Sequence, residues 1–173
     1  MFDTNFFPLE EIRERNLRKF SIDENLSFAY SAALIDAEGT ITIRRNKNRF
    51  YPMLIICNTN KEVLEKIKET FEMGSIRIVN YKNKKRKPLF IFSLSRVADV
   101  LSVLTVCYPY FIIKKTHATR LISFCRSRLI NKRREPTEEE KELYMEIRKL
   151  NARGVQSNDF DTKNDTSSIL QTI

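Results

Sequence analysis

Histidine and cysteine are scarce in this sequence, and their scarcity excludes or disfavours several kinds of site. The chain has 173 residues, with three cysteines and a single histidine, His117. Three irregularly spaced cysteines exclude a disulfide-stabilised scaffold and a zinc site of regularly spaced cysteines. One histidine alone also disfavours catalysis that is based on histidine side chains.

Long apolar segments are absent as well. No apolar run reaches the length that crosses a membrane, and residues 1–16 lack the basic start and apolar stretch of a signal peptide. We therefore expect an intracellular protein without a membrane partner, although cytoplasm, nucleus and organelle are not distinguishable. Apolar residues still make up 42% of the chain, which is enough for the core of one domain with short extensions.

Acidic residues are too few to balance the basic ones. The chain has 31 Lys and Arg against 22 Asp and Glu, a formal net charge of +9. The last 19 residues contain one lysine and three aspartates, a net charge of −2, so residues 1–154 carry +11. A single domain with this much positive charge is expected to bind a polyanion.

The order of predicted elements indicates an α+β domain with one antiparallel sheet. The elements are a helix at 24–37, strands at 40–47 and 50–58, a helix at 61–71, strands at 76–81 and 88–94, and helices ending near 106, 129 and 150. This order is αββαββα with additional C-terminal helices, and Gly39 is expected to end the first helix as its C′ residue. We divide the chain into residues 1–23, an N-terminal extension with a short helix; residues 24–154, the domain; and residues 155–173, a polar tail.

The helix predicted at 24–37 has two unusual features. Ala29, Ala33 and Ala37 are spaced four apart on one face, which lets two helices approach closely, although packing on the domain's own sheet would also use them. Asp36 and Glu38 lie in the last turn, where the helix dipole is already negative and a carboxylate costs about 0.3–1 kcal/mol. A bound divalent cation would reverse that cost, whereas the plainer alternative is a solvated acid at a helix end.

Residues 31–39 read Ser-Ala-Ala-Leu-Ile-Asp-Ala-Glu-Gly and resemble the LAGLIDADG motif of homing endonucleases. Six of the nine positions match, namely Ala32, Leu34, Ile35, Asp36, Ala37 and Gly39. The departures are Ser31, Ala33 and Glu38; glutamate keeps the charge of the motif and Ala33 keeps the helix face small. The resemblance extends through the αββαββα order over about 24–130.

The resemblance implies that residues 24–154 form a LAGLIDADG endonuclease domain. A site-specific, intron-encoded DNA endonuclease of this family makes a metal-dependent double-strand break in a long pseudo-palindromic site. The chain contains one copy of the motif, and in this family such chains work as homodimers. The faces with Ala29, Ala33 and Ala37 would then pack together in two subunits and bring both Glu38 side chains close.

The resemblance also implies the catalytic residues. Glu38 and the carbonyl of Ala37 are expected to hold Mg²⁺, with Mn²⁺ as a substitute, and this ion would supply the attacking water. Asn60 matches the polar residue that organises the water shell, and Lys114 matches the basic residue near the scissile phosphate. Each has a plainer alternative, namely Asn60 as the N-cap of the next helix and Lys114 as a surface lysine at the start of a helix.

Strand alternation separates a face that is expected to contact DNA from a face toward the core. The residues predicted to bind DNA from the outer face are Thr42, Arg44, Asn46, Tyr51, Arg77, Tyr81 and Ser93. A two-stranded ribbon fits the major groove, where Arg44 and Arg77 could each bond guanine bidentately. The strand at 50–58 is apolar on both faces, so alternation does not fix its register; the resemblance implies that Tyr51, Met53, Ile55 and Cys57 point outward. Apolar outer residues would meet thymine methyl groups, and their role stays open.

Basic residues also cluster at both hairpin tips without an intervening acid. The predicted phosphate-binding residues are Arg44, Arg45, Lys47 and Arg49 at the first tip, and Lys82, Lys84, Lys85, Arg86 and Lys87 at the second. Charged loops are commonly just solvated, but two basic tips on one sheet favour a role in positioning DNA.

Two other functions remain as alternatives. The first is a LAGLIDADG protein that binds nucleic acid without cleaving it, such as an intron-splicing maturase or a regulator. The second is a basic RNA-binding module, whose stacking aromatic residues on the sheet are missing here. The acid at position 38 favours cleavage over binding alone.

Overall fold

The computed structural model describes residues 22–79, 81, 87–131 and 135–152. The short helix predicted within residues 1–23 and the tail predicted at 155–173 lie outside the described residues. So do four residues of the second predicted phosphate-binding tip, Lys82, Lys84, Lys85 and Arg86.

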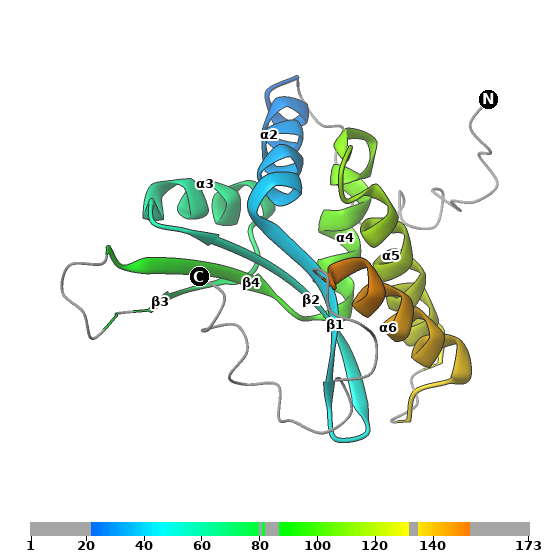
Figure 1. The fold of residues 1–173 in the computed structure, drawn as a ribbon. Coiled ribbons are helices and arrows are strands. Elements are labelled where there is room, and N and C mark those ends of the chain that lie inside the picture. The colour runs from blue at the N-terminus through cyan, green and yellow to red at the C-terminus, as the bar shows by residue number, and fades with distance from the viewer. Residues whose placement is uncertain (1–21, 80, 82–86, 132–134, 153–173) are drawn as a thin grey trace.

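The described elements follow the predicted αββαββα order with additional C-terminal helices (Figure 1). They are α2 (Ile22–Glu38), β1 (Gly39–Asn46), β2 (Arg49–Asn58), α3 (Lys61–Phe71), β3 (Ser75–Val79), β4 (Leu89–Leu94), α4 (Val97–Cys107), the 3₁₀ turn η2 (Tyr108–Tyr110), α5 (Lys115–Ile130) and α6 (Glu138–Asn151). Their bounds differ from the predicted ones by one or two residues, and the α+β fold class is confirmed.

The four strands form one antiparallel sheet in the order β1-β2-β4-β3. Pairing fixes the register of β2, because Tyr51 lies opposite Arg44 and Met53 lies opposite Thr42. Residues directly opposite each other in neighbouring strands point to the same face of a sheet. The outward residues of β2 are therefore Tyr51, Met53, Ile55 and Cys57, as the resemblance implied.

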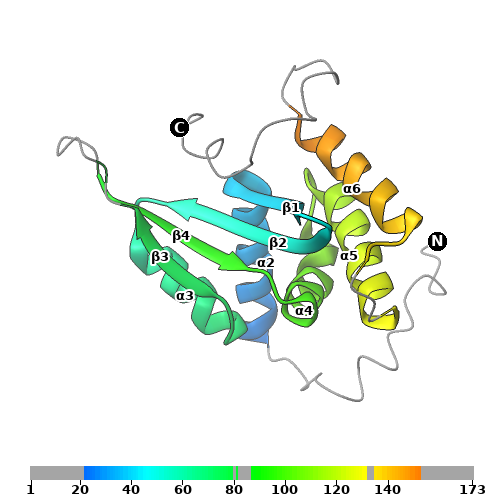
Figure 2. The ribbon, with the colours of Figure 1, turned by 90° about the horizontal axis from the view of Figure 1, so that it is seen from below.

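The described helices cover one face of the sheet. Figure 1 shows α2 and α3 above the strands, and in the view from below the strands lie in front of these helices (Figure 2). The inward residues Ile41, Leu54 and Phe92 have no exposed surface and join side chains of all five helices in one core. No described helix lies on the opposite face, which leaves that face open to a partner.

Gly39 joins α2 directly to β1. The helix ends directly before Gly39, as predicted, but among the described glycines only Gly74 has a positive φ, so Gly39 lacks the left-handed conformation that is common at C′. Space requires a glycine at this position, because a Cβ would lie 2.6 Å from the carbonyl oxygen of Ile35. The last position of the motif therefore sets how closely β1 leaves the end of α2.

A buried ion pair ties the C-terminal helices to the sheet. Glu140 has no exposed surface, and its Oε2 accepts hydrogen bonds from Arg128 Nη1 at 3.3 Å and from the backbone N–H of Thr137 at 3.1 Å. Arg128 also donates from Nη2 to the carbonyl of Phe50 at the start of β2. This network fixes α5 and α6 against the β1–β2 hairpin.

Candidate functional site

Asp36, the sixth residue of the motif, is engaged by the chain segment that leads into α5. Its Oδ2 accepts hydrogen bonds from the backbone N–H groups of Ile112 at 2.7 Å and Ile113 at 3.1 Å, and its Oδ1 accepts one from Lys114 at 2.9 Å. These donors directly precede α5, where the helix dipole is positive. The negative charge of Asp36 is therefore stabilised by a second helix, and the side chain is only 7% exposed.

Lys114 is held at the same end of α2. Its Nζ donates a hydrogen bond to the backbone carbonyl of Asp36, and the residue is half-buried. Because α2 ends two residues later at Glu38, this contact brings the ammonium group to the helix end that carries the predicted metal ligand. Glu38 and Lys114, which are far apart in the sequence, thus both lie at the C-terminal end of α2.

Glu38 is the last residue of α2, and it is exposed. No basic residue lies in the last turn of this helix, and the carboxylate receives a hydrogen bond from Asn58, whose Nδ2 lies 2.8 Å from Oε2. The carbonyl of Ala37 has no partner within the helix, because the helix ends one residue later. A carboxylate and a neighbouring carbonyl are oxygen donors of the kind that Mg²⁺ binds.

The structure brings Asn58 to this carboxylate and gives Asn60 a different contact. Asn60 is the N-cap of α3, because its Oδ1 accepts the N–H of Glu62 at 3.0 Å. Asn58 in turn accepts the N–H of Asn60 at 2.8 Å through its own Oδ1. The sequence analysis did not predict a role for Asn58, although the sequence contains one signal for it. Asn58 is polar, whereas the other inward positions of β2 are apolar, namely Phe50, Pro52, Leu54 and Ile56.

His117 lies between α5 and the end of α6, near the groups at the end of α2. Burial lowers the pKa of its imidazole; a hydrogen bond to the backbone of Leu150 opposes this, Lys114 lowers the pKa further, and Asp36 raises it. Nδ1 is buried and has no hydrogen-bond partner among the residues that the structure describes. The imidazole is therefore neutral near pH 7 and joins two helices of the core.

The predicted DNA-contacting residues of the strands share the open face of the sheet. Arg44 on β1 and Arg77 on β3 belong to the two outer strands, so they lie on either side of the face. The same face carries Thr42, Asn46, Tyr51 and Ser93, as their pairing shows. The hydroxyl of Ser93 lies 3.2 Å from that of Ser75 across the sheet.

Arg45 belongs to the opposite face. Its Nε donates to the carbonyl of Lys47 at 3.0 Å, and it lines a depression of about 490 Å³ together with Phe50 and Tyr144. Lys47 and Arg49 at the first hairpin tip are exposed, as is Lys87 before β4. The tip therefore presents cations on both sides of the β1–β2 hairpin.

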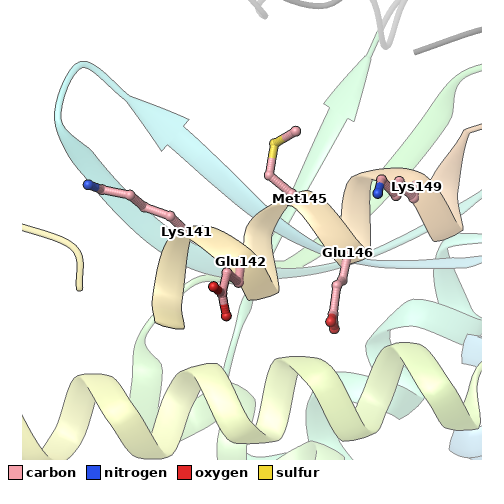
Figure 3. A pocket seen from close by; sticks show the side chains of 5 residues that line it. All are labelled: Lys141, Glu142, Met145, Glu146 and Lys149. Carbon is pink, nitrogen blue, oxygen red and sulfur yellow. The ribbon is translucent and has the colours of Figure 1, made fainter. Parts of the chain in front are cut away.

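A second depression, of about 330 Å³, lies on α6 alone. Figure 3 shows the side chains that line it, namely Lys141, Glu142, Met145, Glu146 and Lys149. Glu146 extends toward α5, where its Oε2 pairs with Nε of Arg120 at 2.7 Å. The depression mixes charges of both signs and contains none of the predicted site residues, so it is not part of this site.

One face of α2 is not covered by the rest of the described chain. Ala33 and Ala37 are exposed and Ala29 is half-buried, so the domain's own sheet does not use this face as a whole. Leu26 and Tyr30 extend it and are 70% and 51% exposed. The face ends at Glu38, which places the candidate metal ligand at its foot.

Within one described chain, few side chains at the end of α2 could bind a metal ion. Within the described ranges, no three His, Cys, Asp or Glu side chains are grouped so that they could hold a metal ion. With Asp36 engaged by the start of α5, this end of the chain offers the carboxylate of Glu38 and the carbonyl of Ala37. Further oxygen donors would have to come from a second copy, a bound phosphate or water.

No helix in the described part of the chain is long and apolar enough to span a membrane.

The fold and site define an αββαββα protein with an acid at the end of its first described helix and an open basic sheet face. Solved structures with a similar fold include LAGLIDADG homing endonucleases. The homing endonuclease I-CvuI in complex with its target has a TM-score of 0.62 and 18% identity over 75% of this chain and 85% of that chain. The archaeal intron-encoded I-Vdi141I complexed with DNA has a TM-score of 0.60 and 21% identity over 79% and 91%. The LAGLIDADG meganuclease I-AabMI bound to uncleaved DNA has a TM-score of 0.56 and 17% identity over 70% and 43%.

No protein-family profile matches the sequence, and no curated protein matches it. The chain therefore has the fold of the LAGLIDADG homing endonucleases, as its motif predicted, at low sequence identity.

Proposed function

We propose that this chain is a site-specific DNA endonuclease of the homing type that acts as a homodimer. The observation that carries the proposal is that Lys114 contacts the last turn of α2, which ends at the exposed Glu38 beside the small, uncovered face of that helix. DNA bound to the sheet would pass this carboxylate, and a second α2 packed on the first would bring a second carboxylate beside it. The similar solved structures include DNA complexes, and I-Vdi141I is described as intron-encoded.

Double-stranded DNA is the proposed substrate because of the charges on the sheet. The four strands contain no Asp or Glu and carry four arginines, namely Arg44, Arg45, Arg49 and Arg77. A two-stranded antiparallel ribbon has the width that enters the major groove. Two sheets related by a two-fold axis would read a long pseudo-palindromic site.

The donor set at the end of α2 fits Mg²⁺, with Mn²⁺ as a substitute. Glu38 and Ala37 from each subunit would hold the ion, which supplies a water of lowered pKa and neutralises phosphate charge. Asn58 orients the Glu38 carboxylate through its amide. Lys114 places an ammonium group where negative charge would develop on the scissile phosphate.

The test is the variant Glu38→Gln on DNA that spans intron-less insertion sites. It is expected to lose cleavage in Mg²⁺ by orders of magnitude and to bind DNA about as well, because glutamine keeps the size but not the charge. The matched control is Glu69→Gln, which changes an exposed acid on α3 and should cut normally. Cleavage by Glu38→Gln at the natural rate would refute the metal assignment. Binding without cleavage by the natural chain would favour a maturase-like or regulatory role.

A further inference from the structure

The open face of the sheet carries an apolar cluster at its centre. Ile55 on β2 and Leu89 and Ile91 on β4 are 7%, 9% and 3% exposed. The half-buried residues that pack against them are Met53, Cys57, Val79 and Tyr81. Their strand neighbours on the helix side belong to the main core, so this cluster lies on the opposite face.

A sheet face that contacts only solvent is not expected to carry so many apolar side chains. An antiparallel sheet with helices on one face usually alternates apolar inward residues with polar outward ones. Here β2 is apolar on both faces over 53–57, β4 is apolar on both faces over 89–92, and no described helix covers the second face (Figure 2). The half-buried members of the cluster, such as Met53 and Cys57, keep apolar surface on this face, and apolar surface in such a place is typical of a contact surface.

The charges around the cluster select nucleic acid as its occupant. Arg44 on β1 and Arg77 on β3 flank it on the same face, and none of the described strands carries an acid. A cationic rim around an apolar floor complements a DNA groove, in which phosphates surround the base edges. A second copy of this face would instead bring like charges together.

In the major groove, the C5 methyl of thymine is the apolar group that bases present. Building on the proposed cleavage of DNA, we infer that this cluster reads thymine methyl groups in each half-site. Cys57 lies nearest the end of α2, because its neighbour Ile56 pairs with Gly39, and Ile55 and Met53 follow outward along β2. Arg44, opposite Tyr51, lies farther out. Each half-site is therefore expected to be rich in thymine at inner positions and to carry a guanine farther out.

Replacing thymine by uracil tests this inference, because the change removes only the methyl group. Sites are first selected by the natural chain from a randomised duplex library, and the selected site is then synthesised with uracil in place of thymine. Binding is expected to weaken about fourfold for each contacted methyl, since burying a methyl-sized group is worth about 0.8 kcal/mol. Substitution of one thymine at a time should locate the loss at symmetric inner positions.

Two variants test whether the apolar cluster makes the contacts to the thymine methyl groups. Met53→Gln keeps the length of the side chain but makes its end polar, so the difference between thymine and uracil should shrink at one symmetric pair. Arg44→Ala should keep that difference. Circular dichroism confirms folding, and Cys57→Ser provides a second, smaller change if Met53→Gln misfolds.

The outcomes separate this inference from the proposed function. Equal binding of thymine and uracil sites, with cleavage intact, would overturn the inference and leave the endonuclease proposal standing. Failure to select any DNA would refute both. Loss of self-association in DNA-free Met53→Gln would show that the face contacts a second copy, and would overturn the inference.

Discussion

The two carboxylates of the motif lie two residues apart and have opposite surroundings. Asp36 is 7% exposed and receives three backbone hydrogen bonds from the segment that leads into α5. Glu38 is exposed, and the structure shows one amide donor, Asn58, on its carboxylate. The negative end of α2 disfavours both charges, but only Asp36 is compensated by the positive end of another helix. The contacts of Asp36 therefore join α2 to the start of α5, whereas the exposed Glu38 is the acid that we propose as the metal ligand.

Asp36→Asn is expected to lower the free energy of unfolding by about 1–3 kcal/mol. An amide offers one acceptor oxygen to three part-buried backbone donors, and a donor that is left unsatisfied away from water costs that much. Glu38→Gln should leave the free energy of unfolding unchanged or raise it by less than about 1 kcal/mol, because it removes an unfavourable charge at the helix end. Urea unfolding of both variants checks the contrast; equal destabilisation would contradict the roles assigned here.

The two asparagines near Glu38 are expected to respond differently to truncation. Asn60→Ala removes the N-cap of α3 and should cost about 1 kcal/mol of stability with little effect on cleavage. Asn58→Ala removes the hydrogen bond to the Glu38 carboxylate and should slow cleavage more than it changes DNA binding. Single-turnover cleavage and thermal unfolding of both variants decide between them. A larger cleavage defect in Asn60→Ala would restore Asn60 as the residue that organises the water shell.

These residues show which parts of the candidate site could be predicted from the sequence alone. The nonapeptide predicted Glu38 as a site residue, because a charge at an unfavourable helix end is visible in the primary structure. The partners of Asp36 lie 76 to 78 residues away, so no local pattern could reveal them. Asn60 carries a strong local capping signal that hides the neighbouring Asn58, whose contact with Glu38 exists only after β2 and α2 come together.

At the scale of elements, α2 is a helix with two different faces. One face contributes Phe28, Ala32 and Ile35 to the core, and each is at most 6% exposed. The other face carries Ala33 and Ala37, exposed and small. Spacing predicted both faces, but it could not tell which alanines pack on the domain's own sheet, because that depends on the direction from which the sheet approaches.

Ala33→Leu is expected to weaken the dimer, because its bulk would separate two helices that approach at small residues. Sedimentation should show a dimer for the natural chain and loss of dimer for the variant. Ala98→Leu changes an exposed alanine on α4 in the same way and should leave the dimer intact. A natural chain that stays monomeric at micromolar concentration, even with DNA, would contradict the two-fold arrangement.

The sheet shows a different limit of sequence analysis. Alternation predicted the faces of β1, whose inward residues Ile41 and Ile43 are buried. It could not orient β2, which is apolar on both faces, until pairing with β1 placed Met53 opposite Thr42. The cause is physical: a strand that packs on helices with one face and serves a ligand with the other loses the alternation that reveals its register.

At the scale of the whole molecule, the open face of α2 and the open face of the sheet would act together in a dimer. If two copies pack through α2, their sheets lie on either side of the two-fold axis and both Glu38 side chains meet near it. Each sheet would then cover about one turn of the duplex, so the site should span roughly 20 base pairs and be pseudo-palindromic.

Arg44 and Arg49 should divide recognition between base edges and phosphates. Arg44 lies on the open face beside the apolar cluster, so Arg44→Ala should relax base preference at a symmetric pair of positions by about 1–3 kcal/mol. Arg49 is exposed at the hairpin tip, so Arg49→Ala should weaken binding to all sequences alike and reduce its salt dependence. Profiling both variants against single-base variants of the selected site, at two salt concentrations, measures each effect. Because a two-fold dimer must show the Arg44 effect in both half-sites, a change confined to one half would contradict the symmetric arrangement. Identical profiles for the two variants would contradict the division of roles.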